Sequence, residues 1–148
     1  MTMSSAPRGI LWELVPERAL FVAYYDGPSP NAPSPNAPGP NGDWEAYVAA
    51  LAEHQHKENP RLLVYALEQP PLAAIESMLN VLRGRRWRVA IVSPSIAVRF
   101  MASTFALSVR DVKFFPPGEL AAALKHLDCS PLEEPGVLKV LEGLRAHE

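Results

Sequence analysis

The amino-acid sequence predicts an α/β fold with a mixed, mostly parallel sheet of about five strands, an N-terminal antiparallel hairpin and four to five helices. Three observations carry this prediction. Short runs of β-branched and aromatic residues alternate with longer segments whose apolar residues recur at helical spacing. The first two strand-like runs are separated by a connection of hairpin length, "VPER". Each later strand-like run is followed by a helical segment, an order that calls for parallel strands with right-handed crossovers.

The predicted hairpin consists of Ile10–Leu14 and Ala19–Tyr25. A Pro-rich repeat, "PSPNAPSPNAPGPNG", follows at residues 28–42. Proline lacks a backbone N–H and constrains the residue before it, so this repeat forms neither a helix nor a central strand. Two strands alone are marginally stable in water, and the hairpin must therefore share a sheet with the residues after the repeat. The repeat is an inserted loop and not a domain boundary.

The later elements alternate between strand and helix. Strands are predicted at residues 61–68, 87–92 and 111–115. Asp43 and Ser95 are suitable N-caps, and Pro117 suits a helix start. Four helices are each expected to turn one apolar stripe inward: Trp44, Tyr47, Val48 and Leu51; Leu72, Ile75, Leu79 and Leu82; Ile96, Phe100, Thr104 and Leu107; and Leu120, Leu124 and Leu127.

A last amphipathic helix carries Val137, Leu141 and Leu144 on one face. That face either packs back on the sheet or is offered to a partner. The expected organisation is a disordered N-terminus at residues 1–9, a single domain at residues 10–128 with the inserted loop at 28–42, and a C-terminal helical extension at residues 129–148. A length of 148 residues fits one domain.

Composition excludes several classes of protein. A formal net charge of −2 gives no general attraction to nucleic acid or to an anionic membrane. No stretch reaches the roughly 18 uninterrupted apolar residues that a transmembrane helix needs. The single cysteine, Cys129, allows neither an internal disulfide nor a multi-cysteine metal site. We therefore expect a cytoplasmic protein with no transmembrane segment, no nucleic-acid partner, no metal and no cofactor.

The element order, together with "RVAIVSPSIAVRFMASTF" and "DVKFFPPGELAAALKHL", resembles the STAS/SpoIIAA-like family, whose fold occurs in bacterial anti-sigma-factor antagonists. The resemblance covers roughly residues 10–127 and implies a non-enzymatic protein-interaction module. In the antagonist branch a phosphorylatable Ser lies at the start of the helix after the third strand. The matching stretch here, "LEQPPLAAIES", has no hydroxyl before Ser77. The chain therefore resembles a divergent member that lacks this Ser.

The segment "SPSIAVR" is the strongest candidate site. A helix N-terminus offers unpaired N–H groups and a positive dipole end, so Ser95, with Ser93 and Arg99, could hold a phosphate or carboxylate. The alternative is that Ser95 only caps the helix and Arg99 is a solvated surface residue. Glu68 ends the preceding predicted strand and Gln69 follows it, so both belong to the same edge of the sheet, where open α/β sheets bind ligands.

Other polar segments favour structural roles. His54 and His56 point to different faces of a helix and share no metal easily. The basic stretch at residues 83–88 follows a helix C-terminus, where cations are favoured in any case. Cys129 has no basic neighbour in sequence to lower its pKa. No motif supplies a catalytic residue.

These observations predict a non-enzymatic adaptor or regulator in bacterial signalling, which binds a protein partner through the loop edge at residues 27–43, 68–72 and 93–99. The Pro-rich loop either takes part in that binding or is a passive insertion. A second copy of the chain is a further candidate partner. The alternative function is binding of a small anionic ligand or a lipid headgroup at the helix that starts after Ser95.

Overall fold

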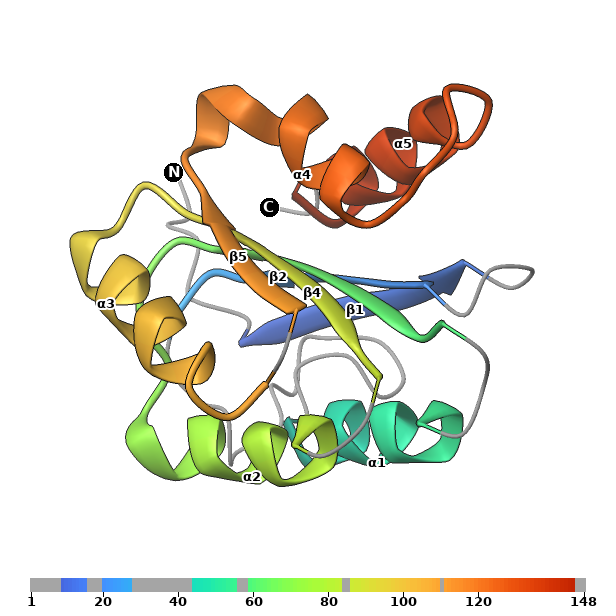
Figure 1. Ribbon diagram of the computed structural model, residues 1–148. Coiled ribbons are helices and arrows are strands. Elements are labelled where there is room, and N and C mark those ends of the chain that lie inside the picture. Colours follow the sequence, from blue (N-terminus) through green and yellow to red (C-terminus); the bar gives the residue numbers. More distant parts are fainter. Residues whose placement is uncertain are drawn as a thin grey trace, which may run out of the picture.

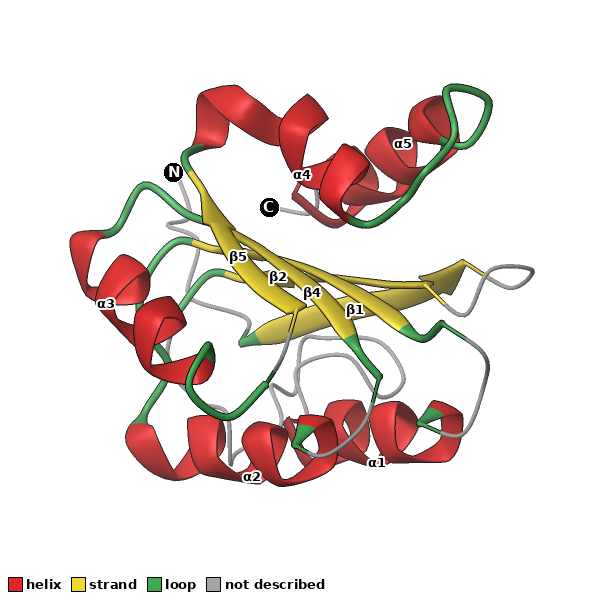
Figure 2. Cartoon of the chain, in the orientation of Figure 1, coloured by secondary structure: helices red, strands yellow, loops and turns green. Residues whose placement is uncertain are grey.

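The fold was analysed in a computed structural model that describes residues 9–15, 20–27, 44–55, 59–83, 86–109 and 111–145 (Figures 1 and 2). Its elements are β1 (Ile10–Val15), β2 (Leu20–Tyr25), α1 (Trp44–His54), β3 (Arg61–Ala66), α2 (Leu72–Leu82), β4 (Arg88–Val92), α3 (Ile96–Phe105), β5 (Asp111–Phe115), the short 3-10 helix η1 (Pro117–Glu119), α4 (Leu120–His126) and α5 (Glu134–Arg145). The predicted α/β fold class is confirmed. The N-terminal residues 1–8, most of the hairpin connection, the Pro-rich insertion, Asp43 and His56 lie outside the described residues.

The five strands lie side by side in their chain order, β1-β2-β3-β4-β5. β1 pairs antiparallel with β2, and the other neighbours are parallel. Every crossover from β2 to β5 steps in the same direction, and right-handed crossovers of that kind place their helices on one face. Figure 1 shows α1, α2 and α3 on that face, while α4 and α5 cover the other.

The central strands are buried on both faces, which explains their continuous apolar sequences. In β2, all six residues are buried. Phe21, Ala23 and Tyr25 join the core under α1–α3, whereas Leu20, Val22 and Tyr24 join the core under α4 and α5. The sheet therefore divides two separate hydrophobic cores.

The C-terminal helix α5 packs back on the sheet. Its apolar face, Val137, Leu141 and Leu144, is buried in the second core, mainly over β2. The Arg145 guanidinium lies 4.5 Å from the centre of the Tyr65 ring on β3. Of the two arrangements left open by the sequence, packing on the sheet is the one observed.

The predicted inward stripe of α3 is wrong. Ile96, Phe100 and Leu107 are 71%, 69% and 87% exposed, and Thr104 is exposed as well. The buried stripe is instead formed by Val98, Ala102 and Phe105. Both stripes have helical spacing, but the small Ala102 lets this side of the helix approach the strands closely. On α2, Leu72 is also exposed, while Ile75, Leu79 and Leu82 are buried as predicted.

The C-terminus of α4 is held by the first residues of three strands. The Arg61 guanidinium, from the start of β3, donates to the carbonyls of Leu127 (3.0 Å) and Asp128 (3.5 Å). Arg88, from the start of β4, donates to the carbonyl of His126 (3.3 Å). The His126 ring lies within hydrogen-bond distance of the carbonyl at the start of β5, 3.0 Å from Nε2 to the Asp111 oxygen. The two arginines thus satisfy carbonyls that a helix end leaves without partners, and the His126 ring ties the end of α4 to the start of β5.

We predict that Arg61→Met lowers the free energy of unfolding by about 1–3 kcal/mol, because it leaves the partly buried Leu127 carbonyl without this donor while keeping an apolar stem. Chemical denaturation monitored by circular dichroism measures this change. Lys139→Met, on the exposed side of α5, is the matched control and should leave stability within about 0.5 kcal/mol of wild type. Equal effects of the two substitutions would contradict the role assigned to Arg61.

Candidate functional site

The loops after the parallel strands meet at one end of the sheet, which we call the carboxyl edge. It comprises Asp26 after β2, residues 67–72 after β3 and residues 93–99 after β4. β3 and β4 are neighbours in the sheet, so the starts of α2 and α3 lie at this same end. The structure thus brings together the predicted site segments, with Glu68 and Gln69 from one loop and Ser93, Ser95 and Arg99 from the next.

The two serines of "SPS" are engaged in local hydrogen bonds. Ser93 is buried, and its hydroxyl oxygen accepts the Ser95 N–H at 3.0 Å. The Ser95 hydroxyl oxygen accepts the Val98 N–H at 3.3 Å and so caps α3. Arg99 is exposed one turn further along the helix. Ser95 therefore acts as the N-cap of α3, which was one of the two roles considered from the sequence. Ser93 is buried and does not present its side chain to a ligand.

The acidic part of the carboxyl edge surrounds Tyr25, the last residue of β2. Burial, and then the negative charges of Glu68 and Asp26, raise the pKa of the Tyr25 phenol to about 12. Asp26 is itself fixed, because its carboxylate accepts the Gly9 N–H at 3.1 Å. Glu68 and Gln69 are exposed. This side of the edge is acidic, whereas the α3 side carries the basic Arg99.

Exposed apolar side chains are the feature of this edge that sequence reasoning missed. Leu67 and Leu72 flank the loop after β3 and are 41% and 68% exposed, and Ile96 is the first residue of α3. Phe100 lies one turn beyond Ile96 on the same face. Among the described residues, these four account for most of the large apolar side chains that are exposed, the others being Leu107 and Leu132. The only sequence signal for this patch was that α3 carries two apolar stripes. Only one of them can face the core, so the other had to be exposed.

Ser77, the first hydroxyl after β3, has a structural role. It donates to the Ala74 carbonyl at 2.9 Å and accepts the indole N–H of Trp44 at 3.1 Å. It therefore links α1 to α2 from the second turn of α2, away from the helix start.

The remaining candidates also have structural surroundings. His54 Nδ1 lies 3.0 Å from the Ala50 carbonyl in its own helix. Cys129 is buried, and that burial raises the pKa of its thiol. Within the described ranges, His, Cys, Asp and Glu side chains form no cluster that could hold a metal ion. Likewise, no helix in this part of the chain is both long and apolar enough to cross a membrane.

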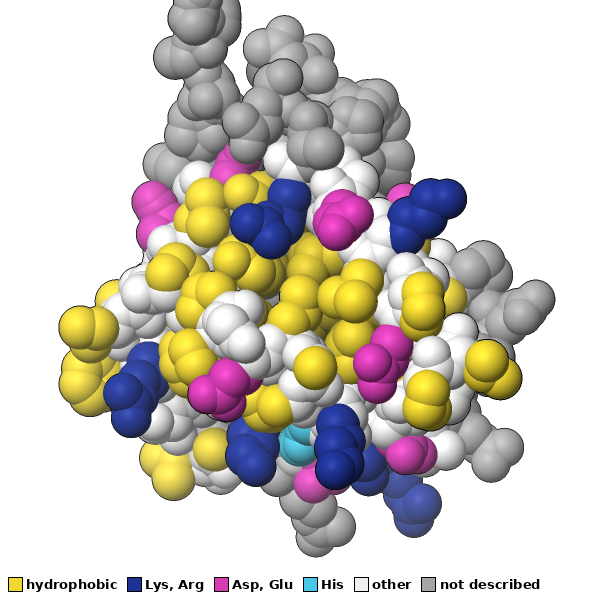
Figure 3. Space-filling view, turned by 90° about the horizontal axis from the view of Figure 1, so that it is seen from above, with side chains coloured by type: hydrophobic (Ala, Val, Ile, Leu, Met, Phe, Trp, Pro, Cys, Tyr) yellow, Lys and Arg dark blue, Asp and Glu magenta, His cyan; other side chains and the backbone are white. Residues whose placement is uncertain are grey.

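The face formed by α4 and α5 carries charges of both signs among its described residues. Figure 3 shows apolar side chains gathered near its middle, with acidic and basic side chains around them.

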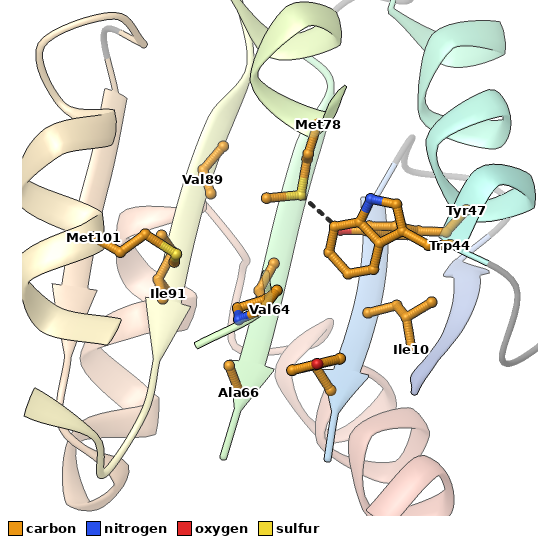
Figure 4. A pocket seen from close by; sticks show the side chains of 11 residues that line it. Ile10, Trp44, Tyr47, Val64, Ala66, Met78, Val89, Ile91 and Met101 are labelled. Atoms are coloured by element: carbon orange, nitrogen blue, oxygen red, sulfur yellow. Dashed lines mark hydrogen bonds between the residues drawn. The ribbon is translucent and has the colours of Figure 1, made fainter. Parts of the chain in front are cut away.

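A small apolar cavity lies between the sheet and α1–α3, close to the carboxyl edge. Its volume is about 20 Å³, and Figure 4 shows its lining, which includes Val64 and Ala66 of β3, Met78 of α2 and Met101 of α3. The Tyr47 hydroxyl donates to the Met78 sulfur at 3.3 Å beside it. An apolar space of this size, on the order of one water molecule, is a packing defect and not a ligand site.

Comparison with known proteins adds no assignment: no family model, no curated protein and no solved structure matches this chain.

The cavity predicts that Val64→Ile stabilises the fold. Val64 is buried on a central strand but keeps 8% exposure beside the cavity, so one added methylene enters open space. We expect a gain in unfolding free energy of up to about 0.8 kcal/mol, measured by denaturant titration. Val22→Ile, on the fully packed opposite face, is the control and should destabilise instead. Equal losses in both variants would contradict the presence of usable space near Val64.

A titration tests the electrostatics of the carboxyl edge. Glu68→Gln removes a nearby negative charge and should lower the pKa of Tyr25 below its value of about 12. NMR of chains carrying ¹³C-labelled tyrosine rings follows this pKa, and Tyr25→Phe assigns the signal. Because the folded pKa is raised, the neutral phenol stabilises the fold fully below pH about 10, and this contribution disappears as pH rises through the folded pKa. An unchanged Tyr25 pKa in Glu68→Gln would contradict their proximity; Glu119→Gln is the distant control.

Proposed function

We propose that this chain is a non-enzymatic protein-interaction adaptor or regulator in bacterial signalling, and that a protein partner binds its carboxyl edge. The observation that carries the proposal is the exposure of Leu67, Leu72 and Ile96 at the ends of neighbouring loops. Apolar side chains that gather on a surface and are rimmed by polar groups are typical of protein-binding sites.

The polar rim fits the same role. Glu68 and Gln69 are exposed beside the leucines, and Arg99 is exposed beside Ile96. Charges of both signs around an apolar centre select a partner and its orientation more than they add affinity. The resemblance to the STAS/SpoIIAA-like family supports the same class of function, and it remains part of this proposal.

The rival function is binding of a small anion or lipid headgroup at the start of α3. It would depend on Ser95 and Arg99, because Ser93 is buried. The Ser95 hydroxyl oxygen is already engaged with the Val98 N–H. The local hydrogen bonds thus account for the serines without an anion, whereas capping does not account for the exposed leucines.

The test is affinity capture from a lysate of the native cells with the full chain and with Leu67→Glu/Leu72→Glu. We expect the wild-type chain to capture a protein that the double variant binds at least 10-fold more weakly, as measured afterwards with the purified partner. Leu132→Glu is the control, since Leu132 is 93% exposed and lies outside the carboxyl edge.

Two outcomes would overturn the proposal: equal capture by all three chains, or capture of no specific protein together with binding of inorganic phosphate or anionic vesicles that is lost in Ser95→Ala/Arg99→Ala. The second outcome would establish the rival function. A parallel chain with residues 28–42 replaced by a short Gly/Ser loop separates a binding contribution of the Pro-rich insertion from that of the rigid edge.

A further inference from the structure

The acidic side of the carboxyl edge is held in place by the fold. The Leu67 N–H donates to the Tyr25 carbonyl at 2.9 Å, so the loop after β3 is tied to the end of β2. Glu68 and Asp26 both lie near enough to the Tyr25 phenol for their charges to raise its pKa. Two carboxylates, from the ends of neighbouring strands, therefore lie around one buried phenol.

A third carboxylate lies beside Leu72. Glu76 follows Leu72 by four residues on α2, and this spacing places two side chains next to each other on a helix. Both side chains are exposed. Because Leu67 directly precedes Glu68, each exposed leucine of this loop has an acidic neighbour.

Glu68 and Glu76 have no positive partner within the described ranges. Neither carboxylate makes a hydrogen bond or an ion pair there. The basic residue of the carboxyl edge is Arg99, which belongs to α3, and in this part of the chain no ion pair joins it to either glutamate. The acidic side of the edge therefore has an uncompensated negative charge.

The position of Glu68 determines which kind of partner suits the leucines. Leu67 and Leu72 flank the loop that carries Glu68, so a surface that buries both leucines also takes water away from the Glu68 carboxylate. Removing water from a charge is strongly unfavourable unless an opposite charge replaces it. A partner that supplies a positive charge at this point is therefore favoured over an uncharged one.

We propose that the protein partner of the carboxyl edge contributes a basic and apolar segment, in which a lysine or arginine pairs with Glu68 and the apolar residues around it contact Leu67 and Leu72. This inference rests on the proposed function and adds the chemistry of its partner. A lysine or arginine suits the site for a second reason, because its long stem packs along leucine side chains while its charged end reaches the carboxylate.

The charges disfavour other partners at this side of the edge. An acidic or phosphorylated segment, or an anionic membrane, would bring like charge to Asp26, Glu68 and Glu76. Juxtaposed like charges suppress binding of the wrong partner, so the three carboxylates act as a filter as well as a binding site.

Three synthetic peptides with one leucine pattern test the charge requirement. Each has leucine at every third or fourth position, and the remaining positions are all lysine, all glutamine or all glutamate. We expect the purified full chain to bind the lysine peptide roughly 10-fold more tightly than the glutamine peptide, and the glutamate peptide most weakly, as measured by isothermal titration calorimetry. Added salt should weaken binding of the lysine peptide, because salt screens ion pairs near the surface.

Substitutions locate the effect at Glu68. Glu68→Gln should weaken binding of the lysine peptide by about 3-fold. Glu142→Gln removes the same charge from the exposed side of α5 and should leave binding unchanged. Both glutamates are exposed, so circular dichroism should show an intact fold in each variant. Equal binding of the lysine and glutamine peptides, equal effects of the two substitutions, or binding of none of the peptides would overturn the inference.

Capture from the cell lysate keeps this outcome separate from that of the proposed function. Glu68→Lys should lose the captured protein, whereas Glu142→Lys should keep it. Loss in Leu67→Glu/Leu72→Glu together with retention in Glu68→Lys would leave the carboxyl edge as the binding site but refute the basic segment. Retention in both would refute the proposed function as well. A dimer of the chain that Leu67→Glu/Leu72→Glu abolishes would assign the edge to a second copy and so overturn the inference.

Discussion

The constraint on which the structure depends is that β2 and β3 are apolar on both faces, so that both faces of the sheet must be covered. Because the strands lie in their chain order, the connecting helices α1, α2 and α3 all lie on one face of the sheet. The chain after β5 therefore has to return across the other face, and α4 and α5 do so in the order in which they emerge. Arg61 and Arg88 fix that return at the strand starts, because they bind the carbonyls at the end of α4.

The same constraint separates the apolar residues that the fold needs from those that it does not. Val98 and Ile75 fill the core between the sheet and its helices. Leu67, Leu72 and Ile96 lie at the carboxyl edge and are 41%, 68% and 71% exposed. These side chains are therefore not needed to fill the core, and the proposed function rests on the carboxyl edge that they help to form.

Sequence patterns predicted most of the fold, because strand and helix order is set by local periodicity; β5 was predicted with its observed bounds. The orientation of α3 could not be predicted, since two apolar stripes on one helix satisfy the same spacing and only the tertiary fit selects one. The role of Arg61 depends on a carbonyl 66 residues away. At the candidate site the polar residues were located from the strand ends, but the burial of Ser93 and the exposure of Leu72 depend on how the loops pack.

The two-sided sheet also affects how the nascent chain matures. Synthesis proceeds from the N-terminus, so β1–β5 and α1–α3 leave the ribosome before α4 and α5. During that interval the sheet face that holds Leu63, Tyr65 and Val92 has no cover, and Arg61 has no helix end to bind. A chaperone that holds apolar surfaces would find its binding site on this half-finished face. Correct folding in the cell therefore depends on α4 and α5 emerging and docking before that face meets another chain.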